Sequence, residues 1–116
     1  MAKIEKFEDL ITWQKARELT VAVYAEFKCL KDFSFKDQIQ RATVSIMNNS
    51  AEGFDRKGNK EFSKFLYIAK GSAAEVKSML YLALDLKYID KSAFDDLTRK
   101  TSEVSRILQG LIASLS

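Results

Sequence analysis

Apolar residues recur along this chain at steps of three and four, the spacing that places side chains on one face of an α-helix. Short polar stretches interrupt this pattern and divide it into four segments. The predicted helices cover roughly residues 8–31, 35–53, 59–87 and 92–115. Because short connections force consecutive helices to be antiparallel neighbours, we expect an all-α fold, an antiparallel up-and-down four-helix bundle. Residues 1–116 are expected to form a single domain around one core.

The second predicted helix has an inward face that becomes polar towards its end. The members of this face are Phe35, Ile39, Ala42, Thr43, Ile46, Asn49, Ser50 and Gly53. A neighbouring stripe consists of Arg41, Ser45, Asn48 and Glu52. A buried amide needs partners, since leaving it unpaired costs about 1–3 kcal/mol. Two interpretations remain open: Asn49 and Ser50 cap or bond neighbouring helices, or Arg41, Asn49 and Glu52 line a site.

The third predicted helix is apolar on two sides. Its inward face consists of Phe62, Phe65, Leu66, Ala69, Ala73, Val76, Leu80 and Ala83. A second stripe consists of Tyr67, Gly71, Ala74, Ser78, Tyr81 and Leu82. A helix of this kind lies centrally in a bundle or has a second partner, and we expect another copy of the chain to be that partner. On the first helix, Arg17 and Tyr24 border an inward face that includes Trp13, and they either reach the same interface or pack at the rim.

Residues suited to helix ends predict where the helices begin and stop. The candidates for the starts are Glu8 or Asp9, Ser34, Asn59, and Asp90 or Ser92. Gly53 suits the left-handed residue that ends a helix, so we expect the second helix to stop there. Gly110 lies inside the fourth helix, where it costs about 1 kcal/mol relative to Ala, and it would permit a close helix crossing.

Composition limits the possible partners and the location of the protein. The chain has 19 Lys and Arg against 16 Asp and Glu, a net charge of +3, and no Pro. This charge is mildly basic and does not by itself require a nucleic-acid partner. No apolar run approaches the roughly 20 residues of a membrane span, and the first ten residues lack the apolar centre of a signal peptide. The lone Cys29 excludes an internal disulfide, so we expect a cytoplasmic protein without a membrane partner.

The residues that most enzyme mechanisms require are missing. The chain contains no His, which removes the commonest general base, the commonest metal ligand and every nucleophile that relies on a neighbouring His. No phosphate-binding Gly-rich loop of the GxxxxGK[ST] type occurs. We therefore expect no catalytic residues, no cofactor, no metal and no small-molecule substrate. Only carboxylate-based Mg²⁺ chemistry stays open, through Glu52, Glu61 and Glu75. These acids are more simply explained by pairing with Arg41 and with backbone donors at helix ends, which would tie the second helix to the third.

A cluster of cations follows the second helix. Arg56, Lys57, Lys60 and Lys64 run from the connecting turn into the third helix. Phosphate contacts need mobile cations on an exposed surface, so this turn cluster is the candidate nucleic-acid contact. A charged helix face is also often no more than a solvated one. A second, looser group consists of Lys91, Arg99, Lys100 and Arg106.

Spaced motifs along the chain resemble those of one bacterial family. RAxVSI at 41–46, NxAEG at 49–53 and EFxxFLxIAxGSxxE at 61–75 occur in the order seen in proteins encoded by intervening sequences of 23S rRNA genes, and FEDL at 7–10 with WQKA at 13–16 resembles the start of their first helix. The matching positions, which we expect to be structural, are Arg41, Ser45, Asn49, Glu52, Gly53, Glu61, Phe62, Phe65, Gly71, Ser72 and Glu75. Met47 stands where the family often has Pro, and Asn48 and Ser50 also depart from its usual residues. These departures should straighten the second helix slightly.

The resemblance implies four-helix protomers that assemble into rings of five, with RNA or ribonucleoprotein association suspected. We therefore expect a non-enzymatic homopentamer that associates with RNA, rRNA or a ribonucleoprotein. The alternative is a ring-shaped adaptor that docks a nucleic-acid enzyme such as a reverse transcriptase, by similarity to ring-forming relatives in mutagenic retroelements. A Mg²⁺-dependent carboxylate enzyme is the third hypothesis and the least supported one.

Overall fold

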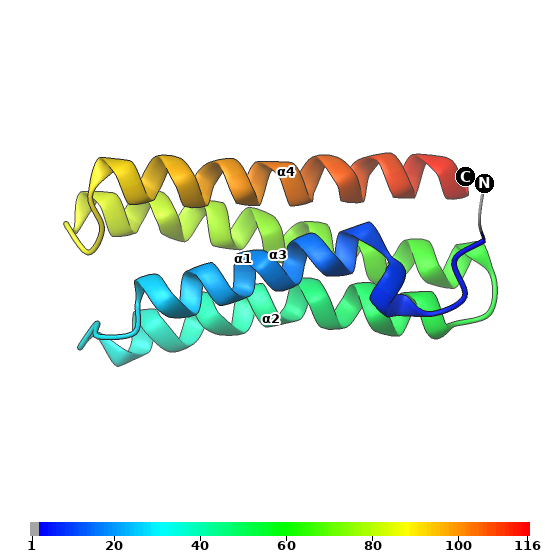
Figure 1. Ribbon diagram of the computed structural model, residues 1–116, viewed down its shortest axis with the longest axis horizontal. Helices are drawn as coiled ribbons and strands as arrows, with labels where there is room; N and C mark the ends of the chain where they lie inside the picture. The colour runs from blue at the N-terminus through cyan, green and yellow to red at the C-terminus, as the bar shows by residue number, and fades with distance from the viewer. Residues whose placement is uncertain (1–2) are drawn as a thin grey trace.

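A computed structural model describes residues 3–116 as a bundle of helices measuring 43 × 22 × 20 Å (Figure 1). Its elements, in chain order, are the short 3-10 helix η1 (Phe7–Asp9), α1 (Ile11–Glu26), α2 (Phe33–Asp55), α3 (Asn59–Asp85) and α4 (Lys91–Leu115). The described range contains no strand. The predicted all-α, four-helix architecture is confirmed.

The helices pack as a closed cycle of neighbours. Each helix packs against the next one along the chain, and α4 closes the cycle by packing against α1. Lys15 of α1 and Glu103 of α4 form an ion pair across this last seam, with 3.5 Å between Nζ and Oε1. Within residues 3–116 the diagonal pairs, α1 with α3 and α2 with α4, do not approach closely. The outer faces of α1 and α3 therefore point to opposite sides of the bundle.

All four helices contribute to one hydrophobic core. The largest side chains that it buries almost completely are Phe27, Leu19, Ile39, Ile46, Leu66, Leu80 and Leu108. Burying a side chain of this size stabilises a fold by about 1.5–3 kcal/mol. Trp13 departs from the prediction that it faces inward: it is only half-buried, and its ring packs edge-on against Phe7 with 5.3 Å between centroids.

The first helix is shorter than the predicted range 8–31. Glu8 and Asp9 belong to η1, and α1 begins only after Leu10, whose backbone is extended and whose side chain is buried. At the other end, the helix gives way to a turn at Phe27. The ring of Phe27 packs against Phe35 of α2, with 5.6 Å between centroids. A residue buried in the core, Leu10 at the start and Phe27 at the end, therefore flanks α1 on each side.

The second helix extends two residues beyond the predicted range 35–53 at each end. Ser34 is not its cap: Asp32 is, and its Oδ1 accepts a hydrogen bond from the Phe35 amide at 3.1 Å. Gly53 does not end the helix in a left-handed conformation either. Gly53 lies inside α2, where an added Cβ would stand 2.6 Å from the Cβ of Phe65. The absence of a side chain therefore lets α2 and α3 approach closely.

The ends of α3 and α4 agree with the predictions in part. Asn59 is the first residue of α3 rather than its cap, which is Gly58 with a φ of 91°. The predicted cap Asp90 of α4 is confirmed, since its Oδ1 accepts from the Ala93 amide at 2.8 Å. Gly110 does not mark a close crossing, because a Cβ at this position would meet nothing within 4 Å.

Candidate functional site

A small polar network lies in the seam between α2 and α3. The hydroxyls of Ser45 and Ser72 are 2.8 Å apart, and Asn49 Nδ2 donates to the Ser45 carbonyl at 2.8 Å and to its Oγ at 3.0 Å. Ser50 Oγ donates to the Ile46 carbonyl at 2.9 Å. Asn49 and Ser50 thus form hydrogen bonds within their own helix, whereas the prediction was that they bond neighbouring helices. Ser45 makes the connection across the seam.

The predicted pairing of Arg41 with Glu52, Glu61 and Glu75 is wrong. Arg41 Nε lies 2.8 Å from Asp37, one turn earlier on the same helix. Glu75 accepts instead from Gln38 Nε2 at 3.2 Å, and Glu61 lies 4.0 Å from Lys64. No hydrogen bond or ion pair within residues 3–116 joins Arg41, Asn49 and Glu52. Local partners on each helix compete successfully with partners across the seam, because they need no additional ordering of long side chains.

The turn between α2 and α3 is held by aromatic contacts. Gly53 sits against Phe62 and Phe65, and the rings of Phe54 and Phe62 pack edge-on with 5.9 Å between centroids. The guanidinium of Arg56 lies 4.9 Å from the centre of the Phe65 ring. Three of the motif positions, Gly53, Phe62 and Phe65, therefore have a structural explanation in this turn.

The turn cluster of cations is exposed as predicted. Arg56, Lys57, Lys60 and Lys64 all present their side chains at the surface. Lys64 is near Glu61 and Arg56 is stacked on Phe65, while Lys57 and Lys60 form no ion pair within the described part of the chain. Two cations of this cluster are thus available to an external anion.

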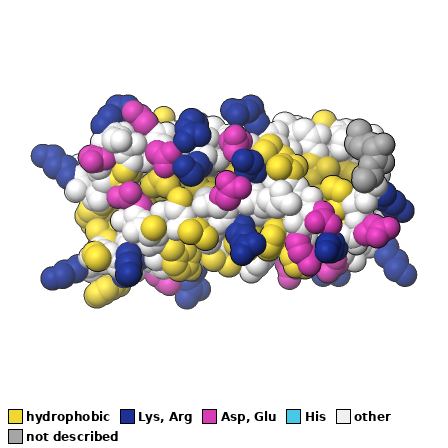
Figure 2. Space-filling view, in the orientation of Figure 1, with side chains coloured by type: hydrophobic (Ala, Val, Ile, Leu, Met, Phe, Trp, Pro, Cys, Tyr) yellow, Lys and Arg dark blue, Asp and Glu magenta, His cyan; other side chains and the backbone are white. Residues whose placement is uncertain are grey.

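Three members of the second basic group are neutralised by carboxylates of their own helix. Lys91 pairs with Asp95 at 2.6 Å, and Asp96 accepts from both Lys100 at 2.8 Å and Arg99 at 2.7 Å. The hydrogen bond from Lys100, followed by the contacts of Arg99, lowers the pKa of Asp96 below 3.8. Arg106, the fourth member, lies apart from these pairs. Figure 2 likewise shows basic and acidic side chains interspersed over the visible face, with apolar side chains between them.

The outer faces of α1 and α3 both expose apolar side chains. On α3 the whole predicted stripe Tyr67, Gly71, Ala74, Ser78, Tyr81 and Leu82 is exposed. Tyr67 has 58 % of its surface accessible, and a Cβ added to Gly71 would meet nothing within 4 Å. On α1, Arg17 and Tyr24 are exposed, and Arg17 lies over the Trp13 ring at 5.4 Å. Tyr81, at one end of this stripe, packs edge-on against Phe94 of α4, with 5.0 Å between ring centroids.

Sequence reasoning missed several residues of these outer faces and one groove. Three further large apolar residues are exposed: Val21 on α1, Ile68 on α3, and Leu86 directly after α3. A groove between α3 and α4 is lined by Lys70, Lys77, Ser102, Ser105 and Arg106, among others. The seven-residue spacing of the two Lys on α3 could have indicated this groove. The α4 residues of the groove could not be predicted from spacing, because their position depends on how α3 and α4 are aligned along each other.

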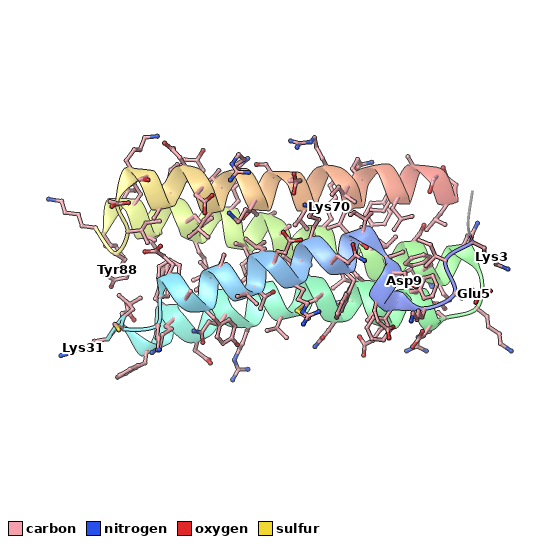
Figure 3. The ribbon with its side chains drawn as sticks, in the orientation of Figure 1. Lys3, Glu5, Asp9, Lys31, Lys70 and Tyr88 are labelled. Carbon is pink, nitrogen blue, oxygen red and sulfur yellow. The ribbon has the colours of Figure 1, made fainter. Side chains whose placement is uncertain are left out.

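One polar contact links the two connections at the far end of the bundle. Tyr88 Oη donates to Asp32 Oδ2 at 2.6 Å, and its ring packs edge-on against Phe35 with 5.3 Å between centroids. Figure 3 shows Tyr88 at the same end as Lys31. The hydrogen bond from Tyr88, aided by that from the Phe35 amide, lowers the pKa of Asp32 below 3.8, and the same bond raises the pKa of Tyr88 above 10.0. This contact is structural and holds the α1–α2 connection against the α3–α4 connection.

Two kinds of feature are absent from the described residues. Among residues 3–116 no three Asp, Glu, Cys or His side chains gather in a way that would hold a metal ion. None of the helices in that range combines the length and apolarity that a membrane crossing requires. The free Cys29 is exposed.

Comparisons with known proteins agree with the motifs. The family model described as 23S rRNA-intervening sequence protein matches residues 8–110. A crystal structure of a protein with unknown function from the S23 ribosomal protein family of Bacteroides thetaiotaomicron superposes with a TM-score of 0.82. The two chains are 25 % identical, and the match covers 87 % of this chain and 97 % of that one. No curated protein matches the sequence. The chain therefore belongs to the 23S rRNA-intervening sequence protein family.

Proposed function

We propose that this chain assembles with copies of itself into a ring that associates with RNA, as a binding protein and not as an enzyme. The observation that carries the assembly is the pair of outer faces on α1 and α3, which expose Tyr24 and Val21 on one side and Tyr67 and Leu82 on the other. Several exposed large apolar side chains on one helix face are typical of protein interfaces. Tyr is also enriched in such interfaces.

The placement of the two faces favours a ring over a symmetric pair. Because α1 and α3 are diagonal in the bundle, their outer faces lie on opposite sides. A symmetric pair that joins two copies through one of these faces would leave the other face uncovered. A contact between the α1 face of one copy and the α3 face of the next is head-to-tail, and head-to-tail contacts close into rings when the rotation per copy allows it. Five copies per ring is the number that the family resemblance suggests.

Ring formation would also concentrate positive charge. In a cyclic assembly every copy presents the same end in the same direction. If the bundles stand side by side, the turn clusters with Arg56, Lys57, Lys60 and Lys64 gather at one rim, and the total charge of five copies is five times +3. Such a rim attracts the phosphates of RNA from a distance, and it does so less as salt is added. The link of the family to rRNA genes makes RNA the polyanion to test.

Assembly is tested by light scattering on the purified chain. We expect a mass of about 66 kDa, five times the 13.2 kDa of one chain. Gly71→Arg should shift the mass towards that of one copy, because a long cation would enter the centre of the α3 face. The matched control is Gly110→Arg, which adds the same side chain to an exposed helical glycine of α4 and should leave the mass unchanged. A wild-type mass of one chain would contradict the ring.

RNA association is tested with a labelled RNA hairpin over a series of salt concentrations. We expect binding at about 50 mM salt that weakens steeply as salt rises, because each phosphate contact releases bound counterions. Replacing Lys57 and Lys60 by Gln should reduce that slope by about 1–2. Absence of binding at low salt, or binding that does not respond to salt, would contradict the RNA role and leave the assembly untouched.

A further inference from the structure

A groove of about 400 Å³ runs between α3 and α4, away from the turn cluster. Lys70 and Lys77 line it from α3, and Ser102, Ser105 and Arg106 line it from α4. Figure 3 shows Lys70 at mid-length of the bundle. Among the described residues no acidic side chain lines the groove, so this lining carries three positive charges and no negative one.

These three cations differ from most others on the same two helices. Lys91, Arg99 and Lys100 are paired with Asp95 or Asp96, and Lys64 lies near Glu61. Within residues 3–116 no carboxylate stands within ion-pair distance of Lys70, Lys77 or Arg106. Lys70 Nζ donates instead to the neutral Gln109 Oε1 across the groove. Unpaired cations facing one another across a groove form a local positive field that an anion would relieve.

The hydroxyls of the groove fit the same kind of ligand. Ser102 and Ser105 are half-buried on its α4 side, and within the described chain neither hydroxyl makes a hydrogen bond. Thr101, by contrast, has its hydroxyl bonded to the Leu97 carbonyl at 2.7 Å. Two free hydroxyls beside Lys and Arg match the oxygens of a phosphate, which accepts hydrogen bonds from both kinds of donor.

The length of the groove distinguishes a phosphate chain from a single phosphate. Lys70 and Lys77 are seven residues apart, which corresponds to about 10.5 Å along a helix axis. Positive charge is therefore spread along a line instead of converging on one point. The part of the chain that the structure describes places no aromatic side chain in the lining, so these residues offer no platform for stacking a base.

We propose that the α3–α4 groove binds the phosphodiester backbone of RNA through Lys70, Lys77 and Arg106, without reading its sequence. This proposal rests on the RNA association proposed above and gives it a location different from the turn cluster. Ala74 belongs both to the groove and to the exposed stripe of α3, so the groove borders the proposed contact between copies. In a ring, one such groove would lie beside each boundary between copies.

The test compares two triple variants that remove the same charge from the full chain. In the groove variant Lys70, Lys77 and Arg106 are each replaced by Gln, and in the control variant Lys91, Arg99 and Lys100 are each replaced by Gln. Binding of a labelled RNA hairpin is followed by fluorescence anisotropy across a salt series, with light scattering and circular dichroism to verify assembly and folding. We expect the groove variant to lose about tenfold or more in affinity at low salt and about 2–3 in the salt slope. The control variant should bind nearly as the wild type does, because its cations are already neutralised.

Each other outcome has a distinct meaning. Equal losses in both triple variants would show that only net charge matters, which would overturn the groove. Unchanged binding by the groove variant, with loss on replacing Lys57 and Lys60, would overturn the groove and retain the RNA role. No binding by the wild type would overturn the RNA role and the groove proposal that rests on it. Saturable binding of inorganic phosphate in a parallel titration, lost in the groove variant while hairpin binding persists, would make the groove a site for free phosphate and overturn its role in RNA binding.

Discussion

Gly53 shows how one missing side chain sets the distance between two helices. Adding a Cβ would place it 2.6 Å from the Cβ of Phe65 and 3.3 Å from the Phe62 carbonyl oxygen, so backbone and not merely a side-chain tip must move. We expect Gly53→Ala to lower the free energy of unfolding by about 1–3 kcal/mol, measured by urea denaturation. Gly110→Ala is the control, and it should raise stability by about 1 kcal/mol because its Cβ meets nothing. Similar gains from both substitutions would contradict the close approach of α2 and α3.

The contact between Asp32 and Tyr88 makes stability depend on pH at both extremes. The carboxylate of Asp32 has a pKa lowered below 3.8 by the Tyr88 hydroxyl, so its contribution is present above that value and is lost as pH falls through the lower, folded pKa. The pKa of Tyr88 is raised above 10.0 by the same bond, so its contribution is present below 10.0 and is lost as pH rises through the higher, folded pKa. Tyr88→Phe should therefore reduce the urea midpoint at neutral pH. The difference from wild type should shrink in strong acid and strong alkali, and a difference that is constant across pH would contradict the contact.

At the scale of elements, the end of α3 carries a residue in an unfavourable conformation. Lys87 has a φ of 62°, and the Tyr88 amide donates to the Ala83 carbonyl at 2.8 Å while the Lys87 amide donates to Leu84 at 3.0 Å. This is the Schellman arrangement, in which glycine is the preferred residue. Lys87→Gly should stabilise the chain by about 1 kcal/mol in thermal or urea unfolding. Lys77→Gly, inside the same helix, should destabilise it by about as much.

The seam between α2 and α3 is the second element-scale feature. Asn49→Leu removes the two hydrogen bonds that Asn49 gives to Ser45, whose hydroxyl in turn meets Ser72. We expect stability to fall by about 1–3 kcal/mol, with RNA binding of the folded fraction unchanged. Loss of binding at unaltered stability would instead identify Asn49 as a contact residue.

The sequence predicted the helices better than their ends or their partners. Periodic apolar spacing suffices to identify four long helices, because each must bury one face. The cap of α2 could not be identified in this way, since Asp32 is also bonded by Tyr88, 56 residues further along the chain. The role of Gly53 depends on Phe65 of the next helix, so local sequence predicts only a helix end at this position.

The candidate surfaces also differ in how far the sequence predicts them. The exposed stripe of α3 and the turn cluster each lie on consecutive turns of one segment, so their exposure could be predicted from spacing. The α3–α4 groove combines Lys70 with Arg106, and only the packing of two antiparallel helices brings these residues to one place. The pairing of Lys100 with Asp96, by contrast, joins residues four apart on one helix, so the spacing alone could have indicated it.

At the scale of the whole molecule, the two outer faces belong to helices of unequal length. The helix α3 has 27 residues and α1 only 16, so an α1 face covers only part of the α3 face that it meets. In the proposed ring the remainder of each α3 face stays free. The ends of α3, including Lys60 and Lys64 of the turn cluster, are the parts that a shorter helix leaves uncovered.

The diagonal placement of α1 and α3 has one more consequence. In a chain whose two contact faces look in opposite directions, the number of copies in a closed circle depends on the angle between these faces and not on their chemistry. A substitution that tilts α1 by a few degrees, deep in the core and far from any contact, would then alter the circumference while leaving both faces intact. Homologues with different stoichiometry would be distinguished by the residues beneath α1.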